Sequence, residues 1–116
     1  RSCGFCNVAT GRPLPVDINE PINIANSIKV MKVKHAVITS VDRDDLKDGG
    51  SGIWVETILQ IRKINPFTTL ETLIPDFKGR REDIQKIIDM RCGGGCVYGL
   101  LNRPPQIILI TTNIVC

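Results

Sequence analysis

Aromatic residues are scarce in this 116-residue sequence, which has three Phe, one Trp and one Tyr. Hydrophobic residues make up 42% of the chain and charged residues 23%, as is usual for globular proteins, so the chain is not expected to be disordered as a whole. A core built from this composition must be mainly aliphatic, filled by Ile, Val and Leu.

The sequence also lacks long hydrophobic runs and a cluster of positive charge. No apolar run approaches the roughly 18 residues that cross a bilayer, and the longest is Ile107–Ile110. The net charge of +3 comes from Lys and Arg residues scattered along the chain. We therefore expect neither a membrane span nor a nucleic-acid partner. No secretion leader is seen after the initial Arg1, so a cytoplasmic location is expected.

Cysteine is too rare for a disulfide scaffold. The five cysteines are odd in number, and two of them form a Cys-x-x-Cys pair, Cys3 and Cys6. This usage favours a reducing compartment and a metal or redox role. The pair can ligate a metal or an iron-sulfur cluster, form a redox disulfide, or remain unused in a loop. A four-cysteine zinc site would need Cys92 and Cys96 as well.

Alternating apolar patterns predict an α/β fold. Five elements are expected, in the order helix, strand, helix, strand, helix, over residues 19–32, 36–41, 52–64, 68–74 and 80–90. Asn19 is the expected N-cap of the first helix. The first strand is β-branched and almost continuously apolar, which is typical of a strand buried on both faces of a parallel sheet. Beyond Arg91 the sequence predicts a linker and one possible strand within Gln106–Thr112.

Polar residues near the predicted strands are candidates for a site. The turn Asp42–Asp45 directly follows the first strand, where α/β folds build ligand sites, although a solvated acidic loop capping the next helix is an alternative. Gly49, Gly50 and Ser51 offer backbone amides at a helix N-terminus, which suits an anion. Glu71 interrupts an apolar strand, so it must be paired or face a ligand. His35 has no partner pattern and is assigned no role.

Several segments together resemble the lipoyl synthase family of radical S-adenosylmethionine (SAM) enzymes. These segments are Arg1–Cys6 with Val8–Pro15, Ile38–Gly50, and Ile74–Arg80. The resemblance covers about residues 1–90, which would form a partial radical SAM core within a TIM-like (β/α) barrel of parallel strands. Residues 91–116 form a divergent tail that does not match the family.

The resemblance implies a set of cofactor residues. Cys3 and Cys6 match the last two ligands of the family's [4Fe-4S] cluster, and Phe5 matches the aromatic residue between them. The candidates for binding SAM are Ser40, Asp42 and Asp44, with Glu71 for the ribose. The first cluster cysteine, four places before Cys3 in the family's motif, would fall two places before Arg1. The auxiliary [4Fe-4S] cluster depends on an upstream three-cysteine motif and a C-terminal serine that these 116 residues do not contain.

The implied activity is sulfur transfer. In the family, a deoxyadenosyl radical removes hydrogen from carbons 6 and 8 of an octanoyl chain, and the auxiliary cluster supplies the two sulfur atoms. The octanoyl chain is carried by a lipoyl-carrier domain or H protein, and flavodoxin or ferredoxin would donate electrons. With ligands missing, the chain is expected to be a truncated and inactive fragment. The alternatives are a sulfur-inserting enzyme similar to biotin synthase and a small four-cysteine zinc module.

Overall fold

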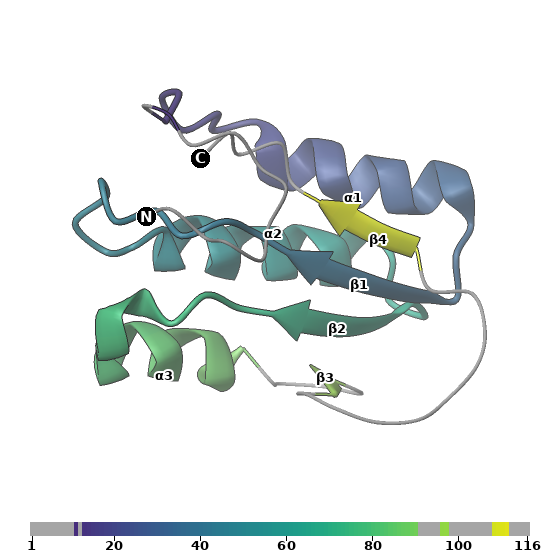
Figure 1. Ribbon diagram of the computed structural model, residues 1–116. Helices are drawn as coiled ribbons and strands as arrows, with labels where there is room; N and C mark the ends of the chain where they lie inside the picture. Colours follow the sequence, from purple (N-terminus) through teal and green to yellow (C-terminus); the bar gives the residue numbers. More distant parts are fainter. Residues whose placement is uncertain (1–10, 12, 91–95, 98–107, 112–116) are drawn as a thin grey trace.

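The computed structural model describes residues 11, 13–90, 96–97 and 108–111 (Figure 1). Strands and helices alternate through most of this part of the chain, as the sequence predicts. The elements are α1 (Glu20–Met31), β1 (His35–Thr39), α2 (Ser51–Ile64), β2 (Thr69–Leu73), the 3-10 helix η1 (Phe77–Gly79), α3 (Arg81–Asp89), β3 (Cys96–Val97) and β4 (Ile108–Thr111).

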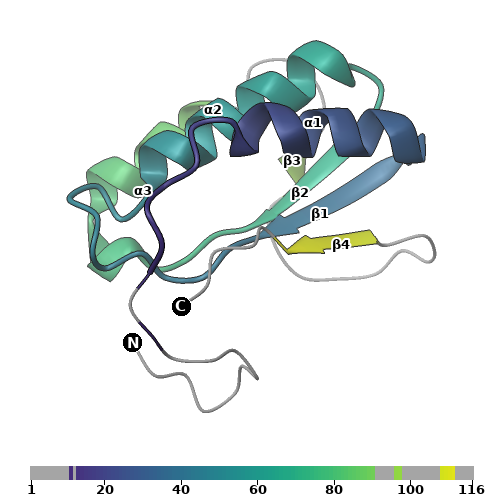
Figure 2. The ribbon, with the colours of Figure 1, turned by 90° about the horizontal axis from the view of Figure 1, so that it is seen from above.

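The strands form one parallel sheet in the order β3-β2-β1-β4. The arrows of β1, β2 and β4 point the same way in Figure 1, and Figure 2 shows α1, α2 and α3 on one side of the sheet. The described residues place no helix on the other side, which we call the helix-free face. The prediction of an α/β fold with parallel strands is confirmed, whereas closure into a barrel stays a prediction.

The core lies between the sheet and the helices. Ala36 and Ile38 of β1 and Leu70 of β2 belong to it, so successive side chains place the odd-numbered residues of both strands on the helix-free face. Val37 is also buried, which confirms that β1 is covered on both sides. The buried apolar side chains of the helices and of η1 that complete this core are Ile24, Ala25, Ile28, Trp54, Ile58, Ile61, Phe77 and Ile87.

The ends of the elements differ from prediction where tertiary contacts decide them. Strand β1 ends at Thr39 and not at Val41, because its partner strand β2 ends opposite Thr39, at Leu73. The N-cap prediction for Asn19 is wrong with respect to the side chain, which caps nothing. Instead, Asp17 Oδ1 accepts a hydrogen bond from the Asn19 amide at 2.8 Å, so Asp17 orders the turn that leads into α1.

Two strands come from the tail. Strand β4 lies inside the predicted segment 106–112 and pairs with β1, with Ala36 opposite Ile108. The short strand β3 was not predicted, because two residues next to a glycine run carry no periodic signal. Both strands extend the sheet in parallel, so the tail contributes to the fold despite its different sequence character.

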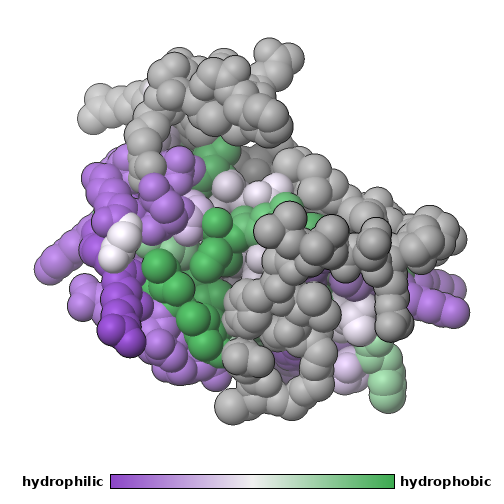
Figure 3. Space-filling view, turned by 60° about the horizontal axis from the view of Figure 1, so that its bottom comes forward, coloured by the Kyte–Doolittle hydropathy of each residue, from purple (hydrophilic) through white to green (hydrophobic). Residues whose placement is uncertain are grey.

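Some large apolar side chains remain exposed in the described part of the chain, and Phe67 is the extreme case at 97% exposure. Figure 3 shows one side of the molecule on which apolar side chains gather next to a hydrophilic margin. The other large apolar residues with substantial exposure are Leu14, Ile18, Val30, Met31, Leu59 and Leu73. The helices therefore cover only one part of the apolar surface.

Asn65 joins the end of α2 to α1. Its buried Nδ2 donates to the Ala25 carbonyl oxygen at 2.8 Å. Replacing Asn65 by alanine is expected to lower the free energy of unfolding by about 1–3 kcal/mol, since a buried hydrogen bond is lost. Urea denaturation measures the change. Asn26→Ala, on the exposed side of α1, is the control, and equal effects of the two substitutions would contradict the role of this bond.

Candidate functional site

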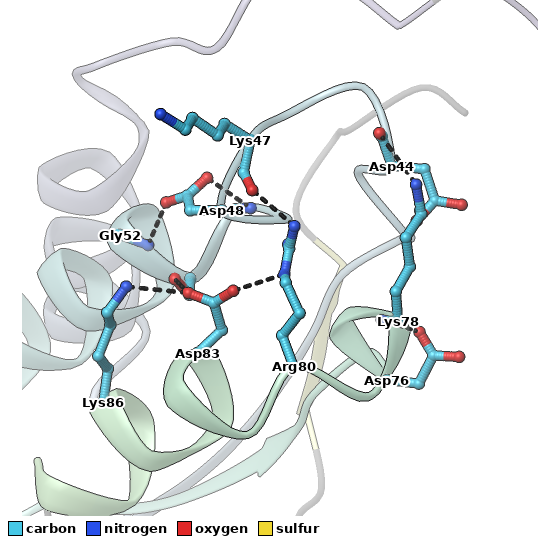
Figure 4. Close-up of polar contacts among 11 residues, drawn as sticks. Asp44, Lys47, Asp48, Gly52, Asp76, Lys78, Arg80, Asp83 and Lys86 are labelled. Atoms are coloured by element: carbon cyan, nitrogen blue, oxygen red, sulfur yellow. Dashed lines mark hydrogen bonds and ion pairs between the residues drawn. The ribbon is translucent and has the colours of Figure 1, made fainter.

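Two loops meet at the edge of the sheet where β1 and β2 end. Residues 40–50 connect β1 to α2, and residues 74–80 connect β2 to α3. Because the strands are parallel neighbours, both loops leave the sheet at the same edge. Lys78 Nζ donates to the Asp44 carbonyl oxygen at 3.4 Å and lies 3.8 Å from Asp44 Oδ1. The candidate Asp44 therefore lies where the two loops meet (Figure 4).

Ser40 is fixed against α2. Its Oγ accepts a hydrogen bond from Trp54 Nε1 at 3.0 Å and donates to the Val41 carbonyl oxygen at 3.2 Å. Ser40 also lines a cavity of about 30 Å³ next to Arg43, large enough for one water molecule. The hydroxyl therefore faces the helix-bearing side of the sheet and already has two partners.

Arg43 is the buried member of the turn Asp42–Asp45, with only 6% of its surface exposed. Its Nε and Nη2 donate to the two carboxylate oxygens of Asp45 at 2.8 and 2.7 Å, which holds the pKa of Asp45 below its ordinary value. Arg43 Nη2 also donates to the Leu14 carbonyl oxygen at 3.2 Å. The view of this turn as a solvated loop is therefore wrong for Arg43, which attaches it to the segment before α1.

Asp48 caps α2. Its carboxylate accepts hydrogen bonds from the amides of Gly50 at 3.0 Å and Gly52 at 2.9 Å. Burial raises the pKa of Asp48, but the bonds from Gly52 and Gly50 outweigh it and keep the pKa below its ordinary value. Gly50 has a φ of +87°, which favours glycine. The expectation of amides available to an anion at Gly49–Ser51 is wrong, because the Gly49 amide donates to the Leu46 carbonyl oxygen at 3.1 Å and the amides of Gly50 and Ser51 bond to Asp48.

Asp83 holds the second loop to α2. Its side chain is 3% exposed and accepts hydrogen bonds from Ser51 Oγ at 2.7 Å and Lys86 Nζ at 2.9 Å. Arg80 Nε and Asp83 Oδ2 form an ion pair at 2.7 Å, but the N–H of Arg80 Nε does not point at this oxygen well enough to form a hydrogen bond. The bond from Lys86, followed by that from Ser51, lowers the pKa of Asp83 despite burial. Arg80 Nη1 extends the network to the Lys47 carbonyl oxygen at 2.6 Å.

The turn before Arg80 has an unusual backbone. Phe77, Lys78 and Gly79 have successive φ angles of +49°, +54° and +71°, in the left-handed region that disfavours side chains. Asp76 Oδ1 accepts a hydrogen bond from the Lys78 amide at 2.9 Å, and the Phe77 side chain is buried in the core. Backbone strain of this kind persists where surrounding contacts impose it, and it is common at functional sites.

Glu71 has an unexpected partner on the helix-free face. His35 Nε2 lies 3.5 Å from Glu71 Oε2, and the two side chains are 33% and 27% exposed. The carboxylate is therefore paired, as its place in an apolar strand requires. Glu71 lies opposite Val37 in the register of the two strands. Val37 comes three residues before Ser40, so Glu71 and Ser40 are about 10 Å apart along the strand direction.

The structure brings together only some of the predicted site residues. Asp42 and Asp44 lie half-buried in the first loop, Ser40 faces α2, and Glu71 lies on the helix-free face. Cys3, Phe5 and Cys6 lie outside the described residues, as does Cys92. No group of three or more His, Cys, Asp or Glu side chains within the described ranges is arranged to hold a metal ion. Sequence reasoning missed the roles of His35, Arg43 and Asp83.

Two further findings concern a membrane span and known protein families. In the part that the structure describes, no helix has the length and apolar character needed to cross a membrane. A scan of protein-family models gives no match to the sequence.

Curated relatives share most of the chain. Lipoyl synthase of Flavobacterium johnsoniae is 66% identical over 89 residues, which cover 77% of this chain and 31% of that protein. The mitochondrial lipoyl synthase of Nematostella vectensis is 66% identical over 90 residues, 78% of this chain and 31% of that protein. Lipoyl synthase of Christiangramia forsetii is 63% identical with the same coverage of both chains. The chain thus spans about 31% of the length of these relatives, and over that span it belongs to the lipoyl synthase family.

Proposed function

We propose that this chain supplies the part of a lipoyl synthase that binds the radical cluster and SAM. The whole enzyme would insert two sulfur atoms at carbons 6 and 8 of a protein-bound octanoyl chain. The observation that carries this proposal is the 66% identity to a lipoyl synthase over 89 residues. Identity at this level over a continuous segment supports the same chemistry in the protein to which the segment belongs.

The residue types suit the two cofactors. The thiolates of Cys3 and Cys6 would be ligands of a [4Fe-4S] cluster, with Phe5 shielding it. When bound and reduced, this cluster supplies the electron that cleaves SAM to the deoxyadenosyl radical. Asp42 and Asp44 are the proposed acceptors for the amino group of SAM, since a carboxylate accepts strong hydrogen bonds from an ammonium group.

The remaining candidates act at other points of the site. Glu71 would accept hydrogen bonds from the ribose hydroxyls, and its side chain on the helix-free face is 27% exposed. Ser40 would act beside the amino end of SAM, where Trp54 fixes its hydroxyl. Lys78 holds the Asp44 backbone, so the second loop would set the position of the first.

The proposed partners follow from the reaction. An octanoylated lipoyl-carrier domain or H protein would deliver the substrate, flavodoxin or ferredoxin would donate electrons, and an auxiliary [4Fe-4S] cluster would donate sulfur. We propose a cytoplasmic location, and the mitochondrial relative makes an organelle the alternative to test.

Anaerobic iron-sulfur reconstitution tests the cluster assignment. A chain extended upstream by two residues, so that a cysteine lies four places before Cys3, is expected to take up about four irons per chain and to absorb broadly near ~400 nm. Replacing Cys3 or Cys6 by serine in that chain should remove most of the iron, because each would lose a thiolate ligand. Cys116→Ser is the matched control and should retain the iron.

The same experiment separates the rival assignment. Colourless protein that binds one zinc, and that loses the zinc when Cys92 or Cys96 is replaced by serine, would identify a four-cysteine zinc module. That result would overturn the radical enzyme proposal. Iron uptake that survives in Cys3→Ser and Cys6→Ser would contradict the assignment of these ligands.

A further inference from the structure

The histidine of β1 lies beside the acidic residue of β2 on the helix-free face. His35 is opposite Thr69 in the register of the two parallel strands, and Glu71 is the next residue of β2 on the same face. It is the only histidine in the 116 residues. The three side chains therefore form one cluster at the start of the two strands, which we call the His35 cluster.

The hydrogen bonds of the His35 cluster have a defined direction. A carboxylate only accepts hydrogen bonds, so the His35 Nε2 that faces Glu71 is the nitrogen that carries the hydrogen. In the neutral ring Nδ1 is then an acceptor. Thr69 Oγ1 has a single hydrogen, and His35 Nδ1 at 2.7 Å is nearer to it than its other acceptor, the Lys34 carbonyl oxygen at 3.1 Å. The bond from Thr69 Oγ1 to His35 Nδ1 fixes the ring plane and its tautomer.

With the ring fixed in this way, the other nitrogen faces the carboxylate. His35 Nε2 lies 3.5 Å from Glu71 Oε2, and both side chains are about one third exposed. A glutamate with three rotatable bonds would otherwise lose considerable side-chain entropy when it adopts one position. Contact with an anchored ring restricts the carboxylate before any ligand arrives, which lowers the cost of binding one.

We propose that His35 is a positioning residue that holds the Glu71 carboxylate ready to accept hydrogen bonds from the hydroxyls of a ligand on the helix-free face, with Thr69 as the anchor of the ring. The inference rests on the proposed function for the identity of that ligand, the ribose of SAM. It adds a residue to which sequence reasoning assigned no role.

Nitrogen NMR of the single histidine tests the anchor on the chain as it exists. In ¹⁵N-labelled protein the Nε2 of His35 is expected to be protonated, and Glu71→Gln should shift its resonance. Thr69→Val should remove the preference for protonated Nε2, whereas Thr69→Ser keeps the hydroxyl and should preserve it. A ring with its hydrogen on Nδ1 alone, or resonances indifferent to Glu71→Gln, would overturn the proposal.

Binding of S-adenosylhomocysteine to the reconstituted chain tests the role of the pair. Glu71→Gln and His35→Phe are each expected to weaken binding about fivefold, since each removes an interaction of the order of one hydrogen bond. If His35 acts through Glu71, the double variant should bind no more weakly than Glu71→Gln alone. His35→Gln, which keeps a donor near Glu71, should recover part of the affinity. Glu56→Gln, on the exposed side of α2, is the control.

The outcomes separate this inference from the proposed function. An effect of Glu71→Gln with none from His35→Phe would overturn the role of His35 and leave the ribose contact standing. If Glu71→Gln has no effect, the ribose contact fails and the positioning role fails with it. Additive losses in the double variant would show that His35 acts independently of Glu71 and would also overturn the inference. Thermal melts of every variant exclude loss of fold as the cause.

Discussion

Replacing Ile61 by alanine is expected to lower the free energy of unfolding by about 2–5 kcal/mol, a large share of the stability of a domain of this size. Ile61 is fully buried on the face of α2 that packs on the sheet. The substitution removes three carbon atoms from a core with few aromatic side chains to fill the space. Denaturation in urea, followed by circular dichroism, measures the loss.

The same helix provides the control. Leu59 lies two residues away and is 48% exposed, so Leu59→Ala removes as many carbon atoms from a partly solvated site. Its effect is expected to be much smaller, within about 1 kcal/mol. Equal losses for Ile61→Ala and Leu59→Ala would contradict the assignment of the buried face of α2.

Replacing Asp83 by asparagine is expected to destabilise the fold at neutral pH and to weaken the dependence of stability on acid pH. The folded pKa of Asp83 is below the ordinary value of 3.8, chiefly because Lys86 and then Ser51 donate to it. A carboxyl with a lowered folded pKa stabilises the protein above the unfolded pKa, near 3.8. That stabilisation is lost as the pH falls from about 4 through the lower folded value.

Other carboxyls set the background for this measurement. The pKa values of Asp45 and Asp48 are also lowered, so they add to the loss of stability in acid. Burial, and then Asp17, raise the pKa of Glu20 above 4.5, so its contribution runs the other way and falls as the pH rises through that range. Asp83→Asn should therefore reduce the acid slope without abolishing it.

Stability measured between pH 2 and 7 tests the role of Asp83. Glu82→Gln is the matched control, because Glu82 is an exposed carboxylate in the first turn of the same helix. An acid slope for Asp83→Asn that equals the slope of the unsubstituted chain would contradict the assigned role of the network.

The sequence predicted the elements better than it predicted the contacts between loops. Apolar periodicity located α1, α2, α3, β1 and β2 to within about two residues, because those patterns decide which face of an element is buried. The left-handed turn at Phe77 and Lys78 could not be predicted, since neither residue type favours positive φ. Contacts across the fold impose that conformation.

The features of the candidate site were also predictable from the sequence only in part. The position of Asp42 and Asp44 after a buried strand followed from the pattern, whereas the contact of His35 with Glu71 depends on the register of two strands about 35 residues apart. The Asp48 cap did have a local signal, because an aspartate two and four residues before glycines is suited to accept from both amides. The burial of Arg43 had no local signal in the sequence.

Several side chains connect distant parts of the fold by donating hydrogen bonds to backbone carbonyl oxygens. Arg43, Lys78, Arg80 and Asn65 donate to the carbonyl oxygens of residues 14, 44, 47 and 25, respectively. Every residue type carries such an oxygen, so these contacts constrain the identity of the donor and not that of the acceptor. Across evolution, the donor positions should therefore tolerate few substitutions. Residues 14 and 47 are both exposed, and their residue types should vary without loss of the loop contacts.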